Sequence, residues 1–229
     1  MKIFKKAFIL LLEKPTVFFK VLRNVFLFYL AYFLRPLRFP QTKNATVRVG
    51  KDVVLQNLAK LTAQKPNALL SIGNNCVIFE NAEIGAYGTG KISIGDNSII
   101  GDVKIFSRYQ INIGKRVLTS WNVFIQDYDP HPVAPDQRAK QVIEMSNNFL
   151  PLIQKRKDMS KYKLDWDFPG KAITIGDDVW IGANVSILKG ANIGNGCIIG
   201  TGSVVIKGNY PDNSIIAGNP AKVVKEIKE

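Results

Sequence analysis

The sequence predicts an all-β solenoid of short stacked strands, with an N-terminal amphipathic α-helical segment and a long extruded loop. Aliphatic residues recur at every sixth position in the last third of the 229-residue chain. Residues 1–40 are basic and apolar, and residues 126–172 keep no sixfold period. We therefore expect a segment at 1–40 and a domain at 41–229 that carries the 126–172 loop.

The composition is that of a globular protein and limits the kind of site it can hold. A hydrophobic fraction of 46%, with 18 Gly and 11 Pro, excludes collagen and a disordered tail. The net charge of +13 favours anionic partners. Two cysteines exclude a disulfide framework. A single histidine excludes metal sites that need two His ligands, so no metal is expected.

The N-terminal segment combines positive charge with apolar residues. Residues 1–40 contain eight Lys and Arg but one acid, and Pro15 predicts two helices, roughly 2–13 and 16–34. The longest run without a charged or amide side chain, 25–34, has ten residues, whereas a membrane span needs about 20. A cleaved signal peptide is not expected, because charges break the apolar region. The segment is typical of a membrane interface; packing on the domain and a tilted insertion remain open.

The sixfold period is the strongest pattern in the chain. A helix repeats every 3.6 residues and cannot keep a period of six, whereas strand–turn units can. Each unit buries one aliphatic and, four places later, one small residue, so the units must stack into a solenoid. The aliphatic series is Ile175, Ile181, Ile187, Ile193, Ile199 and Val205. The small series is Val179, Val185, Ala191, Cys197 and Ser203.

The same period recurs earlier with short slips, which we interpret as corner loops. These units contain Ile72, Cys76, Ile78, Ile84, Ile94, Ser98, Ile100, Ile113, Val117, Thr119 and Ile125. Both cysteines occupy the inward small position. We therefore expect them in the core and not in a redox or metal site.

The 126–172 segment is the expected functional region, because a long excursion from a compact domain usually carries function. It opens with Gln-Asp-Tyr-Asp-Pro-His-Pro at 126–132, and His131 is the only histidine of the chain. A lone histidine that merely caps the loop is the alternative.

These motifs resemble those of the hexapeptide-repeat acyltransferases. The resemblance rests on Ile-Gly-Asp-Asp-Val-Trp-Ile-Gly-Ala at 175–183, Ala-Gly-Asn-Pro-Ala at 217–221, and His131-Pro132 followed by Arg138. It covers roughly 70–228 and favours the galactoside and maltose O-acetyltransferase branch. It implies a left-handed parallel β-helix. The N-terminal extension is reminiscent of relatives that acetylate cell-surface polysaccharides.

The resemblance implies transfer of an acetyl group from acetyl-CoA to a sugar hydroxyl without a covalent enzyme intermediate. His131 would be the general base, since imidazole, with a reference pKa of about 6.5, accepts a proton at neutral pH. The backbone N–H of Ala183 would stabilise the oxyanion.

The residues implied for CoA binding run from the late coils to the C-terminus. They are Ala183, Gly200, Thr201, Lys207, Asn219, Pro220, Lys222 and Lys225. The lysines would supply the cations that the phosphates require; ordinary solvated charges are the alternative.

The expected acceptor-side residues are Arg108, Asn122, Asp127 and Arg138. Arg108 departs from the family pattern, which has an acid there. With the basic run at 155–157 it suits an anionic acceptor such as a diphosphate-linked glycan; a solvated surface is the alternative. Either Asp127 or Asp129 could orient His131, and the sequence does not choose between them.

The partners expected from the resemblance and the charge are a sugar or lipid-linked glycan acceptor, a homotrimer and an anionic membrane surface, with no nucleic acid. The expected location is the cytoplasmic, inner face of the cell membrane, with peripheral association. Two alternatives remain: an N-acetyltransferase of an amino sugar, and a β-helix scaffold without catalysis.

Overall fold

The structure, a computed structural model, describes residues 46–56, 59–64, 67–154 and 168–228, with the backbone alone at 148–154, and four residues nearer the N-terminus. The chain divides into two units, Met1–Pro40 and Gln41–Glu229. The four described residues of the first unit, Thr16, Phe19, Arg23 and Phe26, are helical. The remainder of the segment predicted at 1–40 lies outside the described residues. Among the described residues, no helix combines the length and hydropathy that crossing a bilayer requires.

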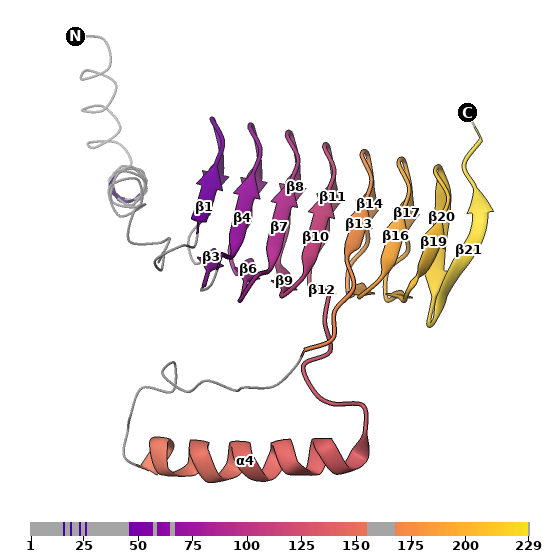
Figure 1. The fold of residues 1–229 in the computed structure, drawn as a ribbon. Helices are drawn as coiled ribbons and strands as arrows, with labels where there is room; N and C mark the ends of the chain where they lie inside the picture. The colour runs from indigo at the N-terminus through magenta and orange to yellow at the C-terminus, as the bar shows by residue number, and fades with distance from the viewer. Residues whose placement is uncertain are drawn as a thin grey trace. The chain divides into compact units, whose positions relative to one another are not determined.

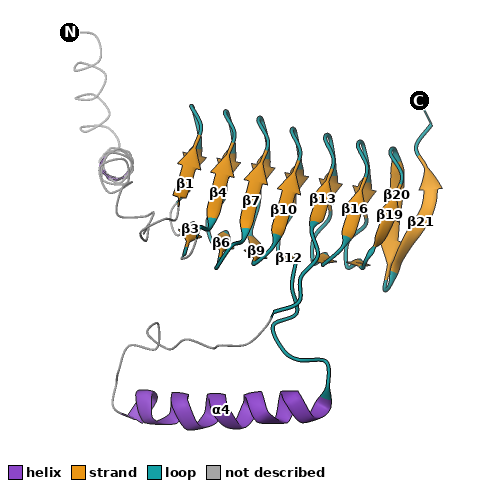
Figure 2. Cartoon of the chain, in the orientation of Figure 1, coloured by secondary structure: helices purple, strands orange, loops and turns teal. Residues whose placement is uncertain are grey.

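The second unit is a three-sided parallel β-solenoid, which confirms the predicted fold class (Figures 1 and 2). Sheet 1 contains β1 (Thr46–Val49), β4 (Leu69–Ile72), β7 (Lys91–Ile94), β10 (Gln110–Ile113), β13 (Ile173–Ile175), β16 (Ala191–Ile193) and β19 (Gly208–Tyr210). Sheet 2 contains β2 (Val54–Leu55), β5 (Val77–Ile78), β8 (Ile99–Ile100), β11 (Leu118–Thr119), β14 (Trp180–Ile181), β17 (Ile198–Ile199), β20 (Ser214–Gly218) and β21 (Ala221–Glu226). Sheet 3 contains β3 (Lys60–Ala63), β6 (Glu83–Ala86), β9 (Val103–Ser107), β12 (Val123–Gln126), β15 (Ser186–Leu188) and β18 (Val204–Val205).

The core is built from the residues that the sixfold period selects. Every aliphatic of the 175–205 series and every small residue four places later is at most 1% exposed. The corresponding residues of the earlier units are at most 4% exposed, and Cys76 and Cys197 are both buried and free. Each coil therefore buries its aliphatic side chains against the coils before and after it.

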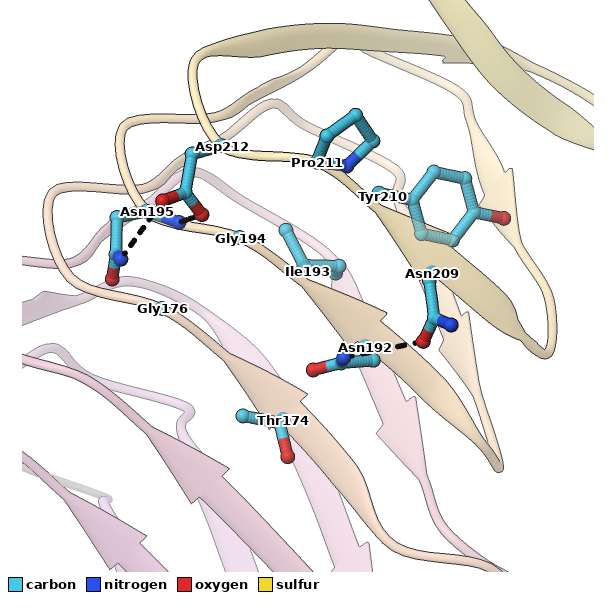
Figure 3. A pocket seen from close by; sticks show the side chains of 10 residues that line it. All are labelled: Thr174, Gly176, Asn192, Ile193, Gly194, Asn195, Asn209, Tyr210, Pro211 and Asp212. Carbon is cyan, nitrogen blue, oxygen red and sulfur yellow. Dashed lines mark hydrogen bonds between the residues drawn. The ribbon is translucent and has the colours of Figure 1, made fainter.

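The outer surfaces of sheets 1 and 2 differ in polarity. The central outward positions of sheet 1 are in register and polar: Ser71, Ser93, Asn112, Thr174, Asn192 and Asn209. The Asn192 amide donates to Asn209 at 3.2 Å, beside an open depression that Figure 3 shows. The outward positions of sheet 2 are apolar: Val54, Val77, Ile99, Leu118, Trp180, Ile198 and Ile215.

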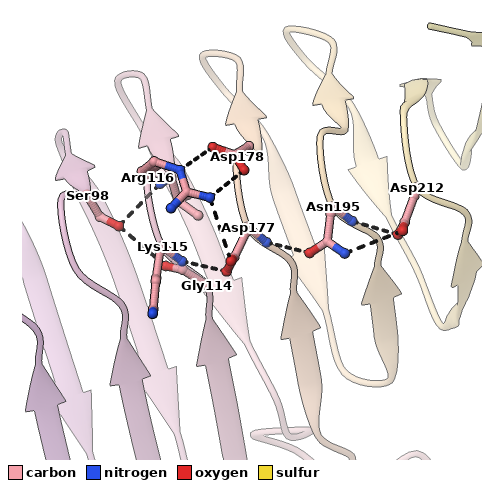
Figure 4. Close-up of polar contacts among 9 residues, drawn as sticks. Ser98, Gly114, Lys115, Arg116, Asp177, Asp178, Asn195 and Asp212 are labelled. Atoms are coloured by element: carbon pink, nitrogen blue, oxygen red, sulfur yellow. Dashed lines mark hydrogen bonds and ion pairs between the residues drawn. The ribbon is translucent and has the colours of Figure 1, made fainter. Parts of the chain in front are cut away.

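Polar side chains connect successive coils at the corner between sheets 1 and 2 (Figure 4). The Lys115 N–H donates to Asp177, the Asp177 N–H to Asn195 and the Asn195 N–H to Asp212, each at 2.8 Å. These bonds satisfy backbone groups that the turn would leave unpaired. The corners are therefore held coil to coil, as the strands are.

The corner turns require left-handed backbone, and the sequence mostly supplies residues that tolerate it. Among the residues that the structure describes, nine of the ten non-glycine residues with positive φ are Asn or Asp. The exception is Arg116, at φ 55°. Its guanidinium holds Asp178 of the next coil through two bonds, of 2.5 and 2.7 Å. This pair lowers the pKa of the Asp178 carboxyl.

The excursion predicted at 126–172 leaves the solenoid between β12 and β13. Its described part holds a helix, α4 (Pro135–Gln154), that the sequence reading treats as loop. The coils on either side still pair, because β10 bonds β13 and β12 bonds β15 across the excursion. The loop thus interrupts the chain but not the stack.

The C-terminal end of sheet 2 departs from the parallel pattern. β21 pairs antiparallel with β20, with a register shift between Ile215 and Ile216. The last parallel strand of this sheet therefore has a partner on both edges.

We expect the core and the polar face of β7 to respond differently to truncation. Ile92 is 1% exposed, whereas the side chain of its neighbour Ser93 points outward to Asn112. Ile92→Ala should lower the free energy of unfolding by about 2–5 kcal/mol. Ser93→Ala should change it by about 1 kcal/mol or less. Denaturant unfolding measures both, and equal effects would contradict the inward and outward assignment.

Candidate functional site

The excursion is tied to the solenoid at its root by Asp127. The carboxylate is buried and accepts bonds from Ser107 Oγ at 2.6 Å, from the Arg108 N–H at 2.9 Å and from the Tyr109 N–H at 3.1 Å. Burial raises the pKa of Asp127, and the bonds from these three residues oppose the rise. Its oxygens are thus already used within the coil, which makes Asp127 an anchor of the loop.

Asp129 provides a second attachment, two residues further on. Its carboxylate forms an ion pair with Lys189, which follows β15 in the next coil. Within the described part of the chain, no hydrogen bond joins Asp127 or Asp129 to His131. Neither of the acids considered from the sequence therefore orients the histidine through a hydrogen bond between described residues.

His131 is exposed, and its partner comes from α4. Its Nδ1 lies 2.9 Å from Oε1 of Gln141, whose side chain is 1% exposed. Arg138, on the same helix, donates from Nη1 to the carbonyls of Pro132 at 3.0 Å and Val133 at 2.9 Å. Arg138 therefore holds the backbone that follows the histidine. Sequence reasoning missed Gln141, because a single glutamine carries no pattern.

Arg108 packs against two aromatic rings near the root of the excursion. Its Cζ lies 3.9 Å from the ring centre of Phe168 and 5.4 Å from that of Tyr128. Its Nε is buried without a hydrogen-bond partner, and no described carboxylate forms an ion pair with it. The guanidinium is thus placed by cation–π contacts.

Ala183 lies in a corner turn beside the following coil. The Gly182 N–H donates to Ile199 at 2.8 Å and the Asn184 N–H to Trp121 at 3.0 Å, whereas the Ala183 N–H has no partner among the described residues. The same turn position in the next coil, Thr201, likewise leaves its N–H unpaired within the described chain. Free backbone donors are what an oxyanion site requires.

The other predicted residues fall into two groups. Asn122 lies beside the Ala183 turn, since its amide donates to Asn184 at 2.8 Å. Gly202 N–H donates to the Ala183 carbonyl at 2.9 Å, which brings the turn at Gly200 and Thr201 next to it. The C-terminal group is exposed and comprises Lys207, Asn219, Pro220, Lys222 and Lys225. None of its lysines forms an ion pair with any described residue.

The depression on sheet 1 does not coincide with the predicted site. The depression in Figure 3 is lined by residues of sheet 1 and its corner, and none of the predicted site residues lines it. Among the described residues, no group of three or more His, Cys, Asp and Glu could hold a metal ion.

Residues 172–207 match the family model described as bacterial transferase hexapeptide (six repeats). The chain is 33% identical over 158 residues to WbbJ of Escherichia coli K12, named as a lipopolysaccharide biosynthesis O-acetyl transferase; the match covers 69% of this chain and 71% of that protein. It is 33% identical over 198 residues to Rv3034c of Mycobacterium tuberculosis, named as an acetyltransferase, covering 86% of this chain and 57% of that one.

The solved structure of NeuO, described as a polySia specific acetyltransferase, is similar in fold and sequence. The TM-score is 0.50 at 25% identity, over 82% of this chain and 87% of that one. The similarity thus extends well beyond the repeats that the family model matches.

The Asp127 anchor should make stability depend on pH in a defined direction. Because the pKa of Asp127 is raised, the folded chain holds this proton more tightly than the unfolded chain, and the contribution is lost as pH rises through the raised value. Asp127→Asn cannot titrate and leaves a backbone donor unpaired, so it should cost about 1–3 kcal/mol. The difference from wild type should be larger near pH ~4 than near pH ~7.

Thermal unfolding across this pH range measures the difference. Asp136→Asn, on the exposed start of α4, is the control and should change stability by about 0.5 kcal/mol or less. A difference for Asp127→Asn that grows as pH rises would show that burial does not control this carboxyl.

Proposed function

Since this chain belongs to the hexapeptide-repeat acyltransferases, we propose that it transfers an acetyl group from acetyl-CoA to a hydroxyl of a sugar, in cell-surface polysaccharide biosynthesis. The observation that carries the proposal is the histidine of the excursion, which is exposed and hydrogen-bonded through Nδ1 to a residue of α4. The similarity to a protein named as a lipopolysaccharide O-acetyl transferase supports oxygen as the acceptor atom.

His131 is the general base of the proposed reaction. A sugar hydroxyl is a poor nucleophile at neutral pH, and it must lose its proton as it attacks. A neutral imidazole accepts that proton and becomes the imidazolium. No other histidine exists in the chain to replace it.

The donor, acetyl-CoA, supplies an activated acyl group as a thioester. The residues that suit it are the turns at Ala183, Gly200 and Thr201 and the cations Lys207, Lys222 and Lys225. The unpaired N–H of Ala183 would donate to the negative charge on the acyl oxygen. The three exposed lysines, with no acidic partner among the described residues, suit phosphates, and Asn219 and Pro220 would shape the turn beside them.

Arg108 favours an anionic acceptor, such as a diphosphate-linked glycan. Its guanidinium is stacked on Phe168 and lacks an ion-pair partner in the described chain. Such a group binds carboxylate or phosphate without first breaking an internal ion pair. Asn122 lies next to the Ala183 turn, and Arg138 holds the backbone after the base.

An N-acetyltransferase of an amino sugar is the second candidate, because a protonated amine also requires a base. Alkaline treatment of the product separates the two, since an ester is cleaved and an amide is retained. A scaffold without catalysis is the third. It would predict that CoA leaves the melting temperature unchanged.

The assembly that we propose is a homotrimer formed through sheet 2. Its outward row is apolar along the solenoid, and Val54, Ile99, Leu118 and Trp180 are 43–50% exposed. A continuous apolar row of this kind marks an interaction surface. The outward row of sheet 1 is polar, so it can remain in contact with water without a partner.

We further propose that the 1–40 segment associates peripherally with the anionic, cytoplasmic face of the cell membrane. The segment carries eight basic residues and one acid. Among its described residues, Phe19 and Phe26 are 58% and 63% exposed, and Arg23 lies between them in sequence. Exposed aromatic and basic side chains are typical of a membrane interface.

The base assignment predicts a large and specific loss of rate. His131→Ala should reduce thiol release from acetyl-CoA, in the presence of sugar acceptors, by about 10²–10⁴-fold or more. The stabilisation of the protein by CoA should persist, because the donor residues are unchanged. Wild-type activity in His131→Ala would overturn the mechanism.

The trimer assignment predicts that one face controls association. Ile99→Lys with Leu118→Lys places two charges in the apolar row and should dissociate the assembly. The matched control, Ser93→Lys with Asn112→Lys, places the same charges on sheet 1 and should not. Light scattering measures the mass, and a fully active wild-type monomer would contradict the proposal.

A further inference from the structure

Helix α4 buries one side chain in its described part, and that side chain is polar. Of residues 135–147, Gln141 alone is buried, at 1% exposed, whereas Val142 and Ile143 are 58% and 61% exposed. A helix normally buries its apolar residues and exposes its glutamines. The oxygen of this buried amide lies 2.9 Å from Nδ1 of His131, so the helix presents a fixed polar group to the ring.

The atom types of this contact define the protonation of the ring. An amide oxygen can only accept a hydrogen bond, so Nδ1 of the neutral imidazole must be the donor and carry the proton. The lone pair of the ring is then on Nε2. His131 is exposed, and Nε2 is the nitrogen left to accept a proton from outside.

We infer that Gln141 is a positioning residue, which holds His131 as the Nδ1–H tautomer and so presents Nε2 as the base. This inference rests on the proposed function for its catalytic meaning, but the tautomer itself does not. Gln141 touches neither substrate nor donor in this role and acts through the ring.

The three charged residues that the sequence places around the histidine, Asp127, Asp129 and Arg138, have partners of their own. Asp127 accepts from Ser107 and backbone N–H groups, and Asp129 pairs with Lys189. Arg138 donates to two backbone carbonyls. The base is therefore oriented by a neutral amide, where a carboxylate is the more familiar partner of a catalytic histidine.

The single histidine makes the tautomer directly measurable. In protein labelled with ¹⁵N at histidine, the chemical shifts of the two ring nitrogens at a pH where the ring is neutral report which one carries the proton, and every histidine signal belongs to His131. Wild type should show Nδ1–H. Nε2–H in wild type would overturn the inference without any variant.

Three variants separate positioning from a structural role. Gln141→Leu removes the acceptor at similar volume and should shift the ring toward Nε2–H. Gln141→Glu retains an acceptor and should keep Nδ1–H. Gln137→Leu, on the exposed surface of the same helix, should resemble wild type. An unchanged tautomer in Gln141→Leu would also overturn the inference.

Kinetics then links the tautomer to the reaction. For Gln141→Leu we expect kcat to fall, within the about 10²–10⁴-fold that a general base contributes, with an unchanged KM for acetyl-CoA. Gln141→Glu should recover most of the loss. Full kcat in Gln141→Leu despite a changed tautomer would refute the positioning role. Full activity in His131→Ala would instead refute the proposed function. The tautomer assignment would then still be decided by the ¹⁵N chemical shifts of the wild-type protein.

Discussion

The aliphatic side chains of each coil point into the space that the three sheets enclose, and each coil completes their burial by stacking on the coils beside it. This is why the sixfold period is so strict between residues 175 and 205, and why none of those aliphatics is more than 1% exposed. Register follows from the same constraint, because a shift by one residue would turn every isoleucine outward. The corners, the outer rows and the excursion all inherit their positions from that register.

Three polar contacts fix the beginning of the excursion and with it the histidine ring. Its polar residues at alternate positions have separate partners: Asp127 in the preceding coil, Asp129 with Lys189 in the following coil, and His131 with Gln141 in the excursion itself. The two aspartates are therefore attached to coils of the solenoid, and the histidine is attached to α4. The histidine depends on both, so its geometry reflects the coil stack as well as the local sequence.

The sequence predicts the stacked coils well because their signal is repeated. The inward position of Ile187 can be inferred from that of Ile199 and the reverse, because both belong to one series. The slips between earlier units fall between strands, at corners of the solenoid. The contacts of the excursion have no such redundancy. Asp127 and Asp129 look equivalent in sequence, and only the coil register buries one and pairs the other with Lys189. Helix α4 was missed because Val142 and Ile143 are exposed and leave no core-facing stripe. Arg116, in a left-handed turn, breaks the local preference that its Asn and Asp counterparts obey.

The antiparallel strand β21 determines how sheet 2 ends. A parallel solenoid ends in open strand edges, which can accept the first coil of another molecule and extend into a fibre. In sheet 2 the last parallel strand, β20, already has β21 along its free edge, running the other way. An incoming coil in parallel orientation would have to displace β21 to continue that sheet. For sheet 2, the C-terminal strand thus occupies the edge that such an extension would use.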